Sequence, residues 1–316
     1  MTLSVDCGTI QDMRFLLSRT DVLGDLIISL PVMERLLSRL PEAEIHWLVR
    51  PATAPVLAGL AGVAAVHLRA DDAELAACMA RLHFDAVLNL AHRDPQVITA
   101  ARAAGVPIRV ARSRGRQIWQ ASHVLWKGRY GSGRHEAMNV LDFLTPWGFQ
   151  GGAPALPALP LTPAERDQGR AELADPGHDR PVLGLVLRGS GAGAFPSLAW
   201  WERAMAVATR AGWRPMVLSP ADAGPLPPAD LRGLMGRLGA CAAVLGPSTG
   251  PVHLAAALGV PVLCLMGLRP HHGPDRWAPL GRRVQVLQYP GPEADLGGGM
   301  DRLDPELLTA HLARLR

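Results

Sequence analysis

The chain has 316 residues, of which 48% are hydrophobic and 19% are charged. This length exceeds one ordinary domain and suits two, and the composition excludes a disordered chain because each half can bury a core. The formal charge of +4 is shared by many soluble proteins, and it also suits a partner that carries phosphates, either a nucleotide or an anionic lipid surface.

In the first half, short apolar runs alternate with segments of helical spacing. The clearest helical segment is 24–40, whose apolar residues recur every three or four positions and which contains Pro31 near its first turns. Strands are predicted at 15–18, 45–49, 63–68, 86–90 and 108–111, and further helices at 54–60, 72–82 and 95–104. This alternation is typical of a parallel sheet covered by helices on both faces.

The middle of the chain breaks this pattern twice. Residues 112–134 are rich in Arg and Gly and lack periodicity, which predicts a long, mobile loop, and residues 135–147 return to helical spacing. Prolines then stand at 154, 157, 160 and 163, a spacing that no regular element tolerates. We therefore predict a linker.

The alternation restarts in the second half. Strands are predicted at 182–187, 215–218, 242–245 and 260–266, and helices at 199–210, 229–238, 251–258 and 303–315. We therefore expect two Rossmann-like α/β domains, 1–152 and 181–316, joined by a Pro-rich linker region at 153–180. Ligands of open α/β sheets bind beyond the carboxyl ends of strands, so we expect parallel sheets facing a central cleft.

The four cysteines are scattered and form no CxxC pair, so the sequence indicates neither a disulfide framework nor a zinc site. Cys241 and Cys264 stand in apolar strand-like runs and are interpreted as buried thiols. The amino terminus lacks the charged and apolar segments of a signal peptide, and no apolar run reaches the roughly 18 residues of a spanning helix. These features predict a cytoplasmic protein.

The first candidate site is the turn at residues 18–25, between the first strand and the first helix. Gly24 suits a tight turn there, and Asp25 stands at the start of the helix, where free N–H groups stabilise a carboxylate. Asp25 is either a helix cap or a general base that points into the cleft.

The second candidate is Gly-Pro-Ser-Thr-Gly-Pro-Val-His at 246–253, after a predicted strand. Ser248, Thr249 and Gly250 open a helix that has Pro251 near its first position, so backbone N–H groups and two hydroxyls can cradle a diphosphate. His253 lies one turn further on and can reach the same anion. The alternatives are capping by the two hydroxyls and a partly buried structural role for the histidine. The segment is neither a Walker loop nor GxGxxG.

Two further loops are candidates. Residues 188–193, Arg-Gly-Ser-Gly-Ala-Gly, follow the first strand of the second half, and their glycines let a ligand approach the backbone. The loop 267–281 contains His271, His272 and Asp275. It fits a polar substrate-contacting loop better than a metal site, since no helical spacing fixes its histidines. We predict no metal.

These segments resemble glycosyltransferase family 9, the heptosyltransferases of bacterial lipopolysaccharide synthesis. The resemblance rests on Gly24-Asp25 with Leu30-Pro31, on residues 41–47, and above all on residues 246–259. Residues 85–110, 135–148 and 277–281 are also similar in pattern, so the resemblance covers nearly the whole chain.

The resemblance implies a GT-B fold with an acceptor-binding amino half and a nucleotide-sugar-binding carboxyl half. It implies transfer of heptose from ADP-heptose to lipopolysaccharide core or a related glycan, with inversion and without a cofactor or nucleic-acid partner. Asp25 would be the base, and the donor would contact Arg188, Ser190, Gly191, Ser248, Thr249, Gly250 and His253. Acceptor contacts are placed at Thr20, Gly24 and Arg129. The protein would be cytoplasmic, with peripheral association at the inner face of the inner membrane as an open alternative.

The sequence departs from the family at 193–196, Gly-Ala-Phe-Pro, where a Lys or Arg before Trp-Pro is usual. Three other readings therefore stay open: a non-catalytic GT-B protein that binds a nucleotide sugar, a glycosyltransferase of another sugar nucleotide, and a sugar-nucleotide epimerase or hydrolase. A nicotinamide dehydrogenase is disfavoured because no GxGxxG follows the first strand.

Overall fold

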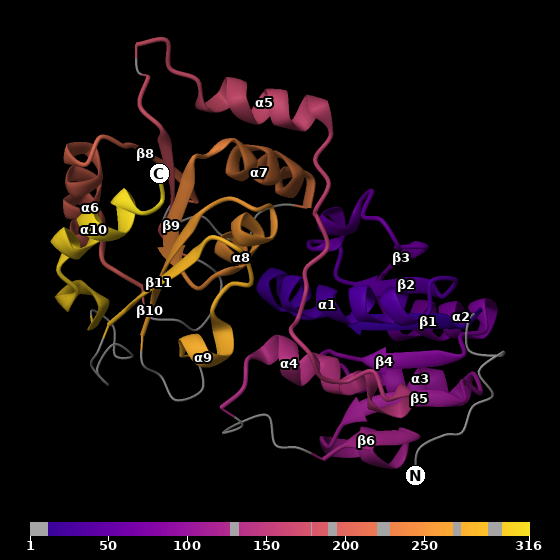
Figure 1. Ribbon diagram of the computed structural model, residues 1–316. Coiled ribbons are helices and arrows are strands. Elements are labelled where there is room, and N and C mark those ends of the chain that lie inside the picture. Colours follow the sequence, from indigo (N-terminus) through magenta and orange to yellow (C-terminus); the bar gives the residue numbers. More distant parts are fainter. Residues whose placement is uncertain are drawn as a thin grey trace. The chain divides into compact units, whose positions relative to one another are not determined.

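The computed structural model describes residues 12–126, 133–177, 179–188, 195–219, 228–267, 273–289 and 299–316. The chain divides into two units, Met1–Pro157 and Ala158–Arg316 (Figure 1). Each unit has its own sheet, and the strands of both sheets pair in parallel. The predicted pair of Rossmann-like α/β domains is thereby confirmed.

The amino-terminal unit contains a six-stranded sheet in the order β3-β2-β1-β4-β5-β6. Its strands are β1 (Arg14–Arg19), β2 (Glu44–Val49), β3 (Ala65–Leu68), β4 (Ala86–Asn89), β5 (Ile108–Arg112) and β6 (His123–Leu125). Its α-helices are α1 (Leu23–Arg39), α2 (Asp72–Leu82), α3 (Gln96–Ala103) and α4 (Glu136–Leu141), and the 3₁₀ helices are η1 (Ala54–Leu57), η2 (Gly115–Trp119) and η3 (Asp142–Trp147). Successive strands are added in one direction from β1 to β3 and in the opposite direction from β4 to β6, so the neighbours β1 and β4 form the topological switch point.

The carboxyl-terminal unit contains a five-stranded sheet in the order β11-β10-β9-β7-β8. Its strands are β7 (Val182–Val186), β8 (Arg214–Ser219), β9 (Ala243–Pro247), β10 (Val262–Met266) and β11 (Val284–Gln288). Its helices are α5 (Pro163–Leu173), α6 (Leu198–Arg210), α7 (Pro228–Ala240), α8 (Gly250–Ala257), α9 (Pro274–Trp277), η5 (Gly299–Arg302), η6 (Pro305–Leu307) and α10 (Leu308–Ala313). Here the switch point lies between β7 and β9.

Both cores consist of continuous apolar strands, as expected for sheets covered on both faces. Phe15, Leu16 and Leu17 of β1 are fully buried, and the predicted buried thiols Cys241 and Cys264 are buried in the second unit. Burial raises the pKa of Cys241 to about 12. Within the part of the chain that the structure describes, no helix is long and apolar enough to cross a membrane.

Two predictions about the middle of the chain need correction. The predicted loop 112–134 contains η2 and the edge strand β6, which pairs with β5 through Val110 and His123. The predicted linker region 153–180 contains the helix α5, and the division between the units falls inside this region, after Pro157. Thr162 and Glu165 form a capping box at the start of α5, with Pro163 in the first turn.

Helix α5 packs closely against α7 through facing glycines. A Cβ atom on Gly236 would lie 2.6 Å from the carbonyl oxygen of Glu165, and a Cβ on Gly169 would collide with the carbonyl of Gly236. Glu165 also receives two hydrogen bonds from Arg232 of α7, at 2.7 and 2.6 Å. The helix is therefore a structural part of the carboxyl-terminal unit.

The Glu165–Arg232 pair predicts acid sensitivity of this unit. Hydrogen bonds from Arg232, and then from Thr162, lower the pKa of Glu165 from 4.5 to about 2. The stabilisation is complete above pH 4.5 and is lost as pH falls towards 2. We expect Glu165→Gln to lower the free energy of unfolding at pH 7 by about 1–2 kcal/mol, because partial exposure screens the pair, and to flatten the dependence of stability on pH below 4.5.

Urea unfolding from pH 2 to pH 7 checks this. Glu172→Gln is the matched control on the same helix, since Glu172 pairs with Arg237 at 3.0 Å but is more exposed, and a smaller loss is expected. If both variants lost the same free energy of unfolding, the larger stabilisation that we assign to Glu165 would be contradicted.

Candidate active site

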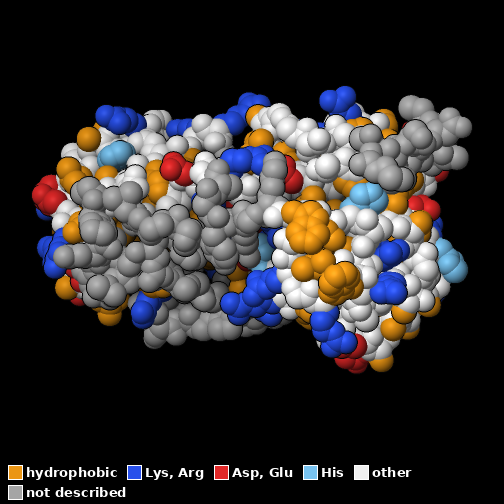
Figure 2. Space-filling model, turned by 90° about the horizontal axis from the view of Figure 1, so that it is seen from below, with side chains coloured by type: hydrophobic (Ala, Val, Ile, Leu, Met, Phe, Trp, Pro, Cys, Tyr) orange, Lys and Arg blue, Asp and Glu red, His pale blue; other side chains and the backbone are white. Residues whose placement is uncertain are grey.

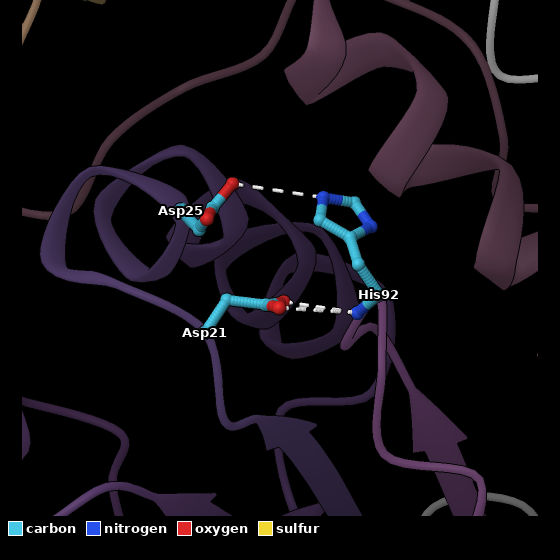
Figure 3. A group of neighbouring side chains, drawn as sticks. All are labelled: Asp21, Asp25 and His92. Atoms are coloured by element: carbon cyan, nitrogen blue, oxygen red, sulfur yellow. Dashed lines mark hydrogen bonds and ion pairs between the residues drawn. The ribbon is translucent and has the colours of Figure 1, made fainter. Parts of the chain in front are cut away.

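The amino-terminal site lies where the chain leaves β1 and β4, the two strands at the switch point. Asp21 follows β1, Asp25 stands in the first turn of α1, and His92 follows β4. Figure 3 shows the three side chains converging from these segments. The site therefore occupies the position at which ligands bind in open α/β sheets.

Arg19, the last residue of β1, contacts both carboxylates of this site. Its side chain is fully buried, with Nη2 2.8 Å from Oδ1 of Asp25 and Nη1 3.5 Å from Oδ2 of Asp21. It also donates to the carbonyls of Asp25 and Leu90. A buried guanidinium needs such partners, so Arg19 fixes the two segments relative to each other.

The Asp25 carboxylate has two differently placed oxygens. Oδ1 contacts Arg19 and lies 3.6 Å from Nε2 of His92, whereas Oδ2 has no hydrogen-bond partner among the residues that the structure describes. The N-cap position of α1 is Val22, without a side-chain cap, so Asp25 does not act as the cap. One oxygen is held and the other is available to a ligand.

His92 and Glu136 belong to the site, although the sequence analysis did not select them. The His92 backbone N–H donates to Asp21 at 3.0 Å, and its Nε2 is 4.0 Å from the fully buried carboxylate of Glu136. Glu136 also pairs with Arg112 at 3.2 Å. For His92, the available signal was the polar run 92–94, which two residues separate from the end of β4, since polar residues near a strand end are site candidates.

Asp21, Asp25 and His92 also offer three ligand atoms within 4.8 Å of one another, a spacing that suits a metal ion. The guanidinium of Arg19 contacts both carboxylates and already compensates their charge. A cation would have to compete with this buried arginine, so the donor set fits an ion-pair network better than a metal centre.

The three residues predicted to contact the acceptor differ in where the structure places them. Thr20 is buried, and its hydroxyl donates to Asp94 at 3.1 Å. Gly24 lies in the first turn of α1, which begins at Leu23, one residue before the predicted start, so the connection from β1 precedes this glycine. Arg129 lies outside the described residues. The contacts themselves stay predictions.

The carboxyl-terminal site lies at the second switch point, where β9 leads into α8. Gly246 of β9 is required by close packing, because a Cβ there would lie 2.8 Å from the carbonyl oxygen of Val186 on β7. Thr249 is the N-cap residue, and Pro251 stands in the first turn of α8, as predicted. The turn between them thus presents the start of a helix beside β7.

Ser248 and His253 form a connected pair in this turn. The Ser248 hydroxyl donates to the carbonyl of Trp277 at 2.9 Å and lies 3.2 Å from Nε2 of His253. Because the serine proton is directed at Trp277, the histidine Nε2–H is the donor to Ser248 Oγ. His253 is only 3% exposed, so it supports Ser248 from within the helix.

Thr249 occupies the N-cap position of α8, but its side chain does not cap the helix as the capping alternative expected. Its side chain makes no cap hydrogen bond, and its buried hydroxyl has no hydrogen-bond partner among the described residues. An unmet buried hydroxyl is costly. The Thr249 hydroxyl can therefore form a hydrogen bond with a ligand that enters the turn.

The other candidates of this unit are partly described. Arg188 lies after β7, with its guanidinium 5.7 Å from the ring centre of Phe195. Ser190, Gly191, His271 and His272 lie outside the described residues. In the loop 267–281 the structure adds the short helix α9, whose last residue supplies the carbonyl that fixes Ser248.

Comparison with known proteins gives one sequence match. Residues 202–295 match the family model of glycosyltransferase family 9 (heptosyltransferase), a segment that includes the turn at 248–253. No curated protein matches the sequence at a significant level.

Solved structures match along almost the whole chain. A family 9 glycosyltransferase from Veillonella parvula is 16% identical with a TM-score of 0.78, covering 97% of this chain and 98% of its own. ADP-heptose lps heptosyltransferase II of E. coli is also 16% identical with a TM-score of 0.78, covering 96% and 98%. The E. coli heptosyltransferase WaaC, solved with ADP, is 15% identical with a TM-score of 0.69, covering 96% and 100%.

These likenesses establish the fold, and the family match adds a sequence signature to the second unit. The likeness extends over both sheets, because each of these structures covers 96% or more of this chain. Residues 202–295 thus carry the signature of glycosyltransferase family 9, and the chain as a whole has the GT-B fold of the solved heptosyltransferases.

Proposed function

We propose that the protein is an inverting glycosyltransferase that transfers a heptose, or a related sugar, from an ADP-sugar to a lipopolysaccharide core or related glycan. The observation that carries this proposal is the family match across the turn of Ser248, Thr249 and His253, at the switch point of its sheet. The named relatives support the donor class, since one is an ADP-heptose enzyme and another was solved with ADP.

In the proposed reaction, Asp25 is the general base. An acceptor hydroxyl gives its proton to Oδ2, while its oxygen forms a bond to the anomeric carbon of the donor. The bond from that carbon to the diphosphate breaks at the same time, and ADP leaves with the electron pair. Arg19 holds Oδ1, which orients the carboxylate for this role.

The carboxyl-terminal turn would stabilise the charge that builds on the leaving diphosphate. The N-terminal end of α8 offers backbone N–H groups and the positive end of a helix dipole. Thr249 adds a hydroxyl that has no hydrogen-bond partner in the part of the chain that the structure describes, and His253 holds Ser248 in place. Such fixed donors stabilise a developing anion without reorganisation.

A second candidate is a nucleotide-sugar-binding protein of the same fold that does not catalyse transfer. The sequence feature that favours it is the absence of a cation in Gly193-Ala194-Phe195-Pro196. Binding without turnover would support this candidate.

Calorimetric titration with ADP-heptose, ADP, UDP-GlcNAc and GDP-mannose tests the proposal. We expect selective binding of ADP-heptose that is weakened in Ser248→Ala and His253→Ala. Tight binding of another sugar nucleotide would replace the donor but keep the site. If no nucleotide sugar binds, the transferase proposal fails.

A further inference from the structure

Two histidines of the amino-terminal unit form a hydrogen-bonded pair outside the candidate active site. Nδ1 of His46, on β2, lies 2.8 Å from Nε2 of His67, on β3, and the two rings are stacked with their centres 5.1 Å apart. The histidine side chains that reach the surface in Figure 2 stand singly among other side chains. The pair differs from such histidines, because a proton on one ring changes the free energy of adding a proton to the other.

A carboxylate fixes the position of one proton in this pair. Oε1 of Glu44 lies 2.8 Å from Nε2 of His46, and Nε of Arg14 donates to Oε2 of the same carboxylate at 2.7 Å. An ionised carboxylate only accepts hydrogen bonds, so Nε2 of His46 carries a proton. The contact between His46 Nδ1 and His67 Nε2 then needs one further proton, which either ring can donate.

The surroundings of His67 oppose a positive charge on its ring. The side chain is partly buried, and Phe84 meets both rings edge-on, with its centre 5.2 Å from that of His46 and 6.3 Å from that of His67. Burial first, then His46 and then Arg81 of α2 lower the pKa of His67. The carboxylate of Glu44 contacts His46 and not His67 in the ion pairs among the described residues. The second proton of the pair is therefore hard to add.

The strand that carries His67 has few other contacts within the sheet. Strand β3 is four residues long, lies at the edge of the sheet (Figure 1) and pairs with β2, where Leu48 is opposite His67. The next residue, Arg69, pairs with Asp94 at 2.8 Å, and Asp94 accepts the hydroxyl of Thr20. A displacement of β3 would therefore separate Arg69 from the loop that follows β4.

We propose that the pair of His46 and His67 is an acid-sensitive contact that holds β3 on β2. The contact is kept while one ring donates to the other. It is lost when both rings are imidazolium ions, because two donors then face each other and two like charges lie side by side. Its loss releases β3 and with it the pair of Arg69 and Asp94. The inference goes beyond the transferase reaction and does not depend on it.

The direction of the pH effect follows from the lowered pKa of His67. The unfolded chain binds this proton near pH 6.5, whereas the folded chain binds it only at lower pH. The stabilisation of β3 is therefore complete above pH 6.5 and is lost as pH falls from there towards the lowered pKa. Hydrogen bonds from His46 and then Arg14 also lower the pKa of Glu44, from 4.5, so the contribution of Glu44 is lost only below that pH.

Amide hydrogen exchange of the full chain, measured by nuclear magnetic resonance from about pH 7.5 to about pH 5, tests the proposal. Protection at the Arg69 amide, which donates to the carbonyl of Val49 at 2.7 Å, should fall by about tenfold for each unit by which the second pKa is lowered. The amides of Leu16 and Leu17 in β1 should stay protected. Ring nitrogen signals of the two histidines should titrate in two coupled steps.

Two neutral variants and a matched control separate the contact from general acid damage. His67→Gln keeps a donor for Nδ1 of His46 and cannot be charged, and His67→Phe keeps a ring against Phe84. Both should show the same β3 protection at each pH. His83→Asn removes an exposed histidine of the same unit, at a φ of 48° that asparagine tolerates, and should lose β3 protection on acidification as the parent protein does.

Three results would overturn the proposal: β3 protection in the parent protein that does not change with pH, independent titration of the two rings near pH 6.5, or neutral variants that lose protection as the parent does. A loss that extended equally to β1 would show global unfolding and would also reject it. Calorimetry with ADP-heptose at about pH 7.5 keeps the two proposals apart. Donor binding without acid release of β3 rejects the histidine contact alone, and acid release without donor binding rejects the proposed function alone.

Discussion

Asp25→Asn is expected to lower kcat by on the order of 10²–10⁴-fold, the usual loss when a general base is removed. The amide keeps the shape of the side chain and can still accept a hydrogen bond from Arg19, so the fold and donor affinity should be retained. What is lost is the basic oxygen Oδ2, which has no described hydrogen-bond partner. Steady-state kinetics with ADP-heptose and a heptose-accepting glycan provide the measurement.

Asp21→Asn is the matched control for that substitution. Asp21 belongs to the same cluster, but both of its oxygens accept the backbone N–H of His92, at 3.3 and 3.0 Å. Its loss should reduce stability and affect kcat by less than about tenfold. If Asp25→Asn retained near-normal turnover, or if the two variants lost activity equally, Asp25 would not be the base.

Thr249→Val is expected to weaken donor binding by about 10- to 100-fold while leaving the melting temperature unchanged or higher. The hydroxyl is buried without a described partner, so replacing it with a methyl group removes a desolvation cost in the free protein. A hydrogen bond to a charged phosphate contributes about 1.5–3 kcal/mol, which is the source of the expected affinity loss. Calorimetry and thermal unfolding of the same preparation give both quantities.

Ser248→Ala separates this effect from general damage to the turn. Ser248 bonds to Trp277 and His253, so its removal should lower stability as well as affinity. We therefore expect both variants to lose donor affinity but only Ser248→Ala to lose stability. A Thr249→Val protein that is destabilised but binds the donor normally would show that the hydroxyl serves the fold.

The alternating strands and helices were predictable because the spacing of apolar residues within each segment determines its type. Apolar spacing in α1 and the continuous apolar runs of β1 and β9 identified these elements to within a residue or two at most ends. Pro251 correctly marked the start of α8. Strand alternation then placed Ser248 in the turn after a strand and Asp25 at the start of the helix that follows one, and the structure has both residues in these places.

The remaining parts depend on contacts between residues that are distant in sequence. Nothing adjacent to His92 indicates that its ring lies near Glu136, 44 positions away, since that proximity needs the completed sheet. Strand β6 has three residues, too few for a periodic signal. Helix α5 was missed because three prolines precede its first residue, Pro163, and because its surface is polar, although its capping box, Thr162 to Glu165, was readable.

The packing of α5 on α7 has a practical consequence for spectroscopy. The carboxyl-terminal unit includes residues from Ala158 onward, and a fragment that began at 181 would lose the helix that faces Gly236 and pairs with Arg232. A ligation point near Ala158, before Thr162, leaves each sheet with all of its helices. The two segments can then be isotopically labelled one at a time, so that nuclear magnetic resonance signals of either unit are recorded alone in the joined protein.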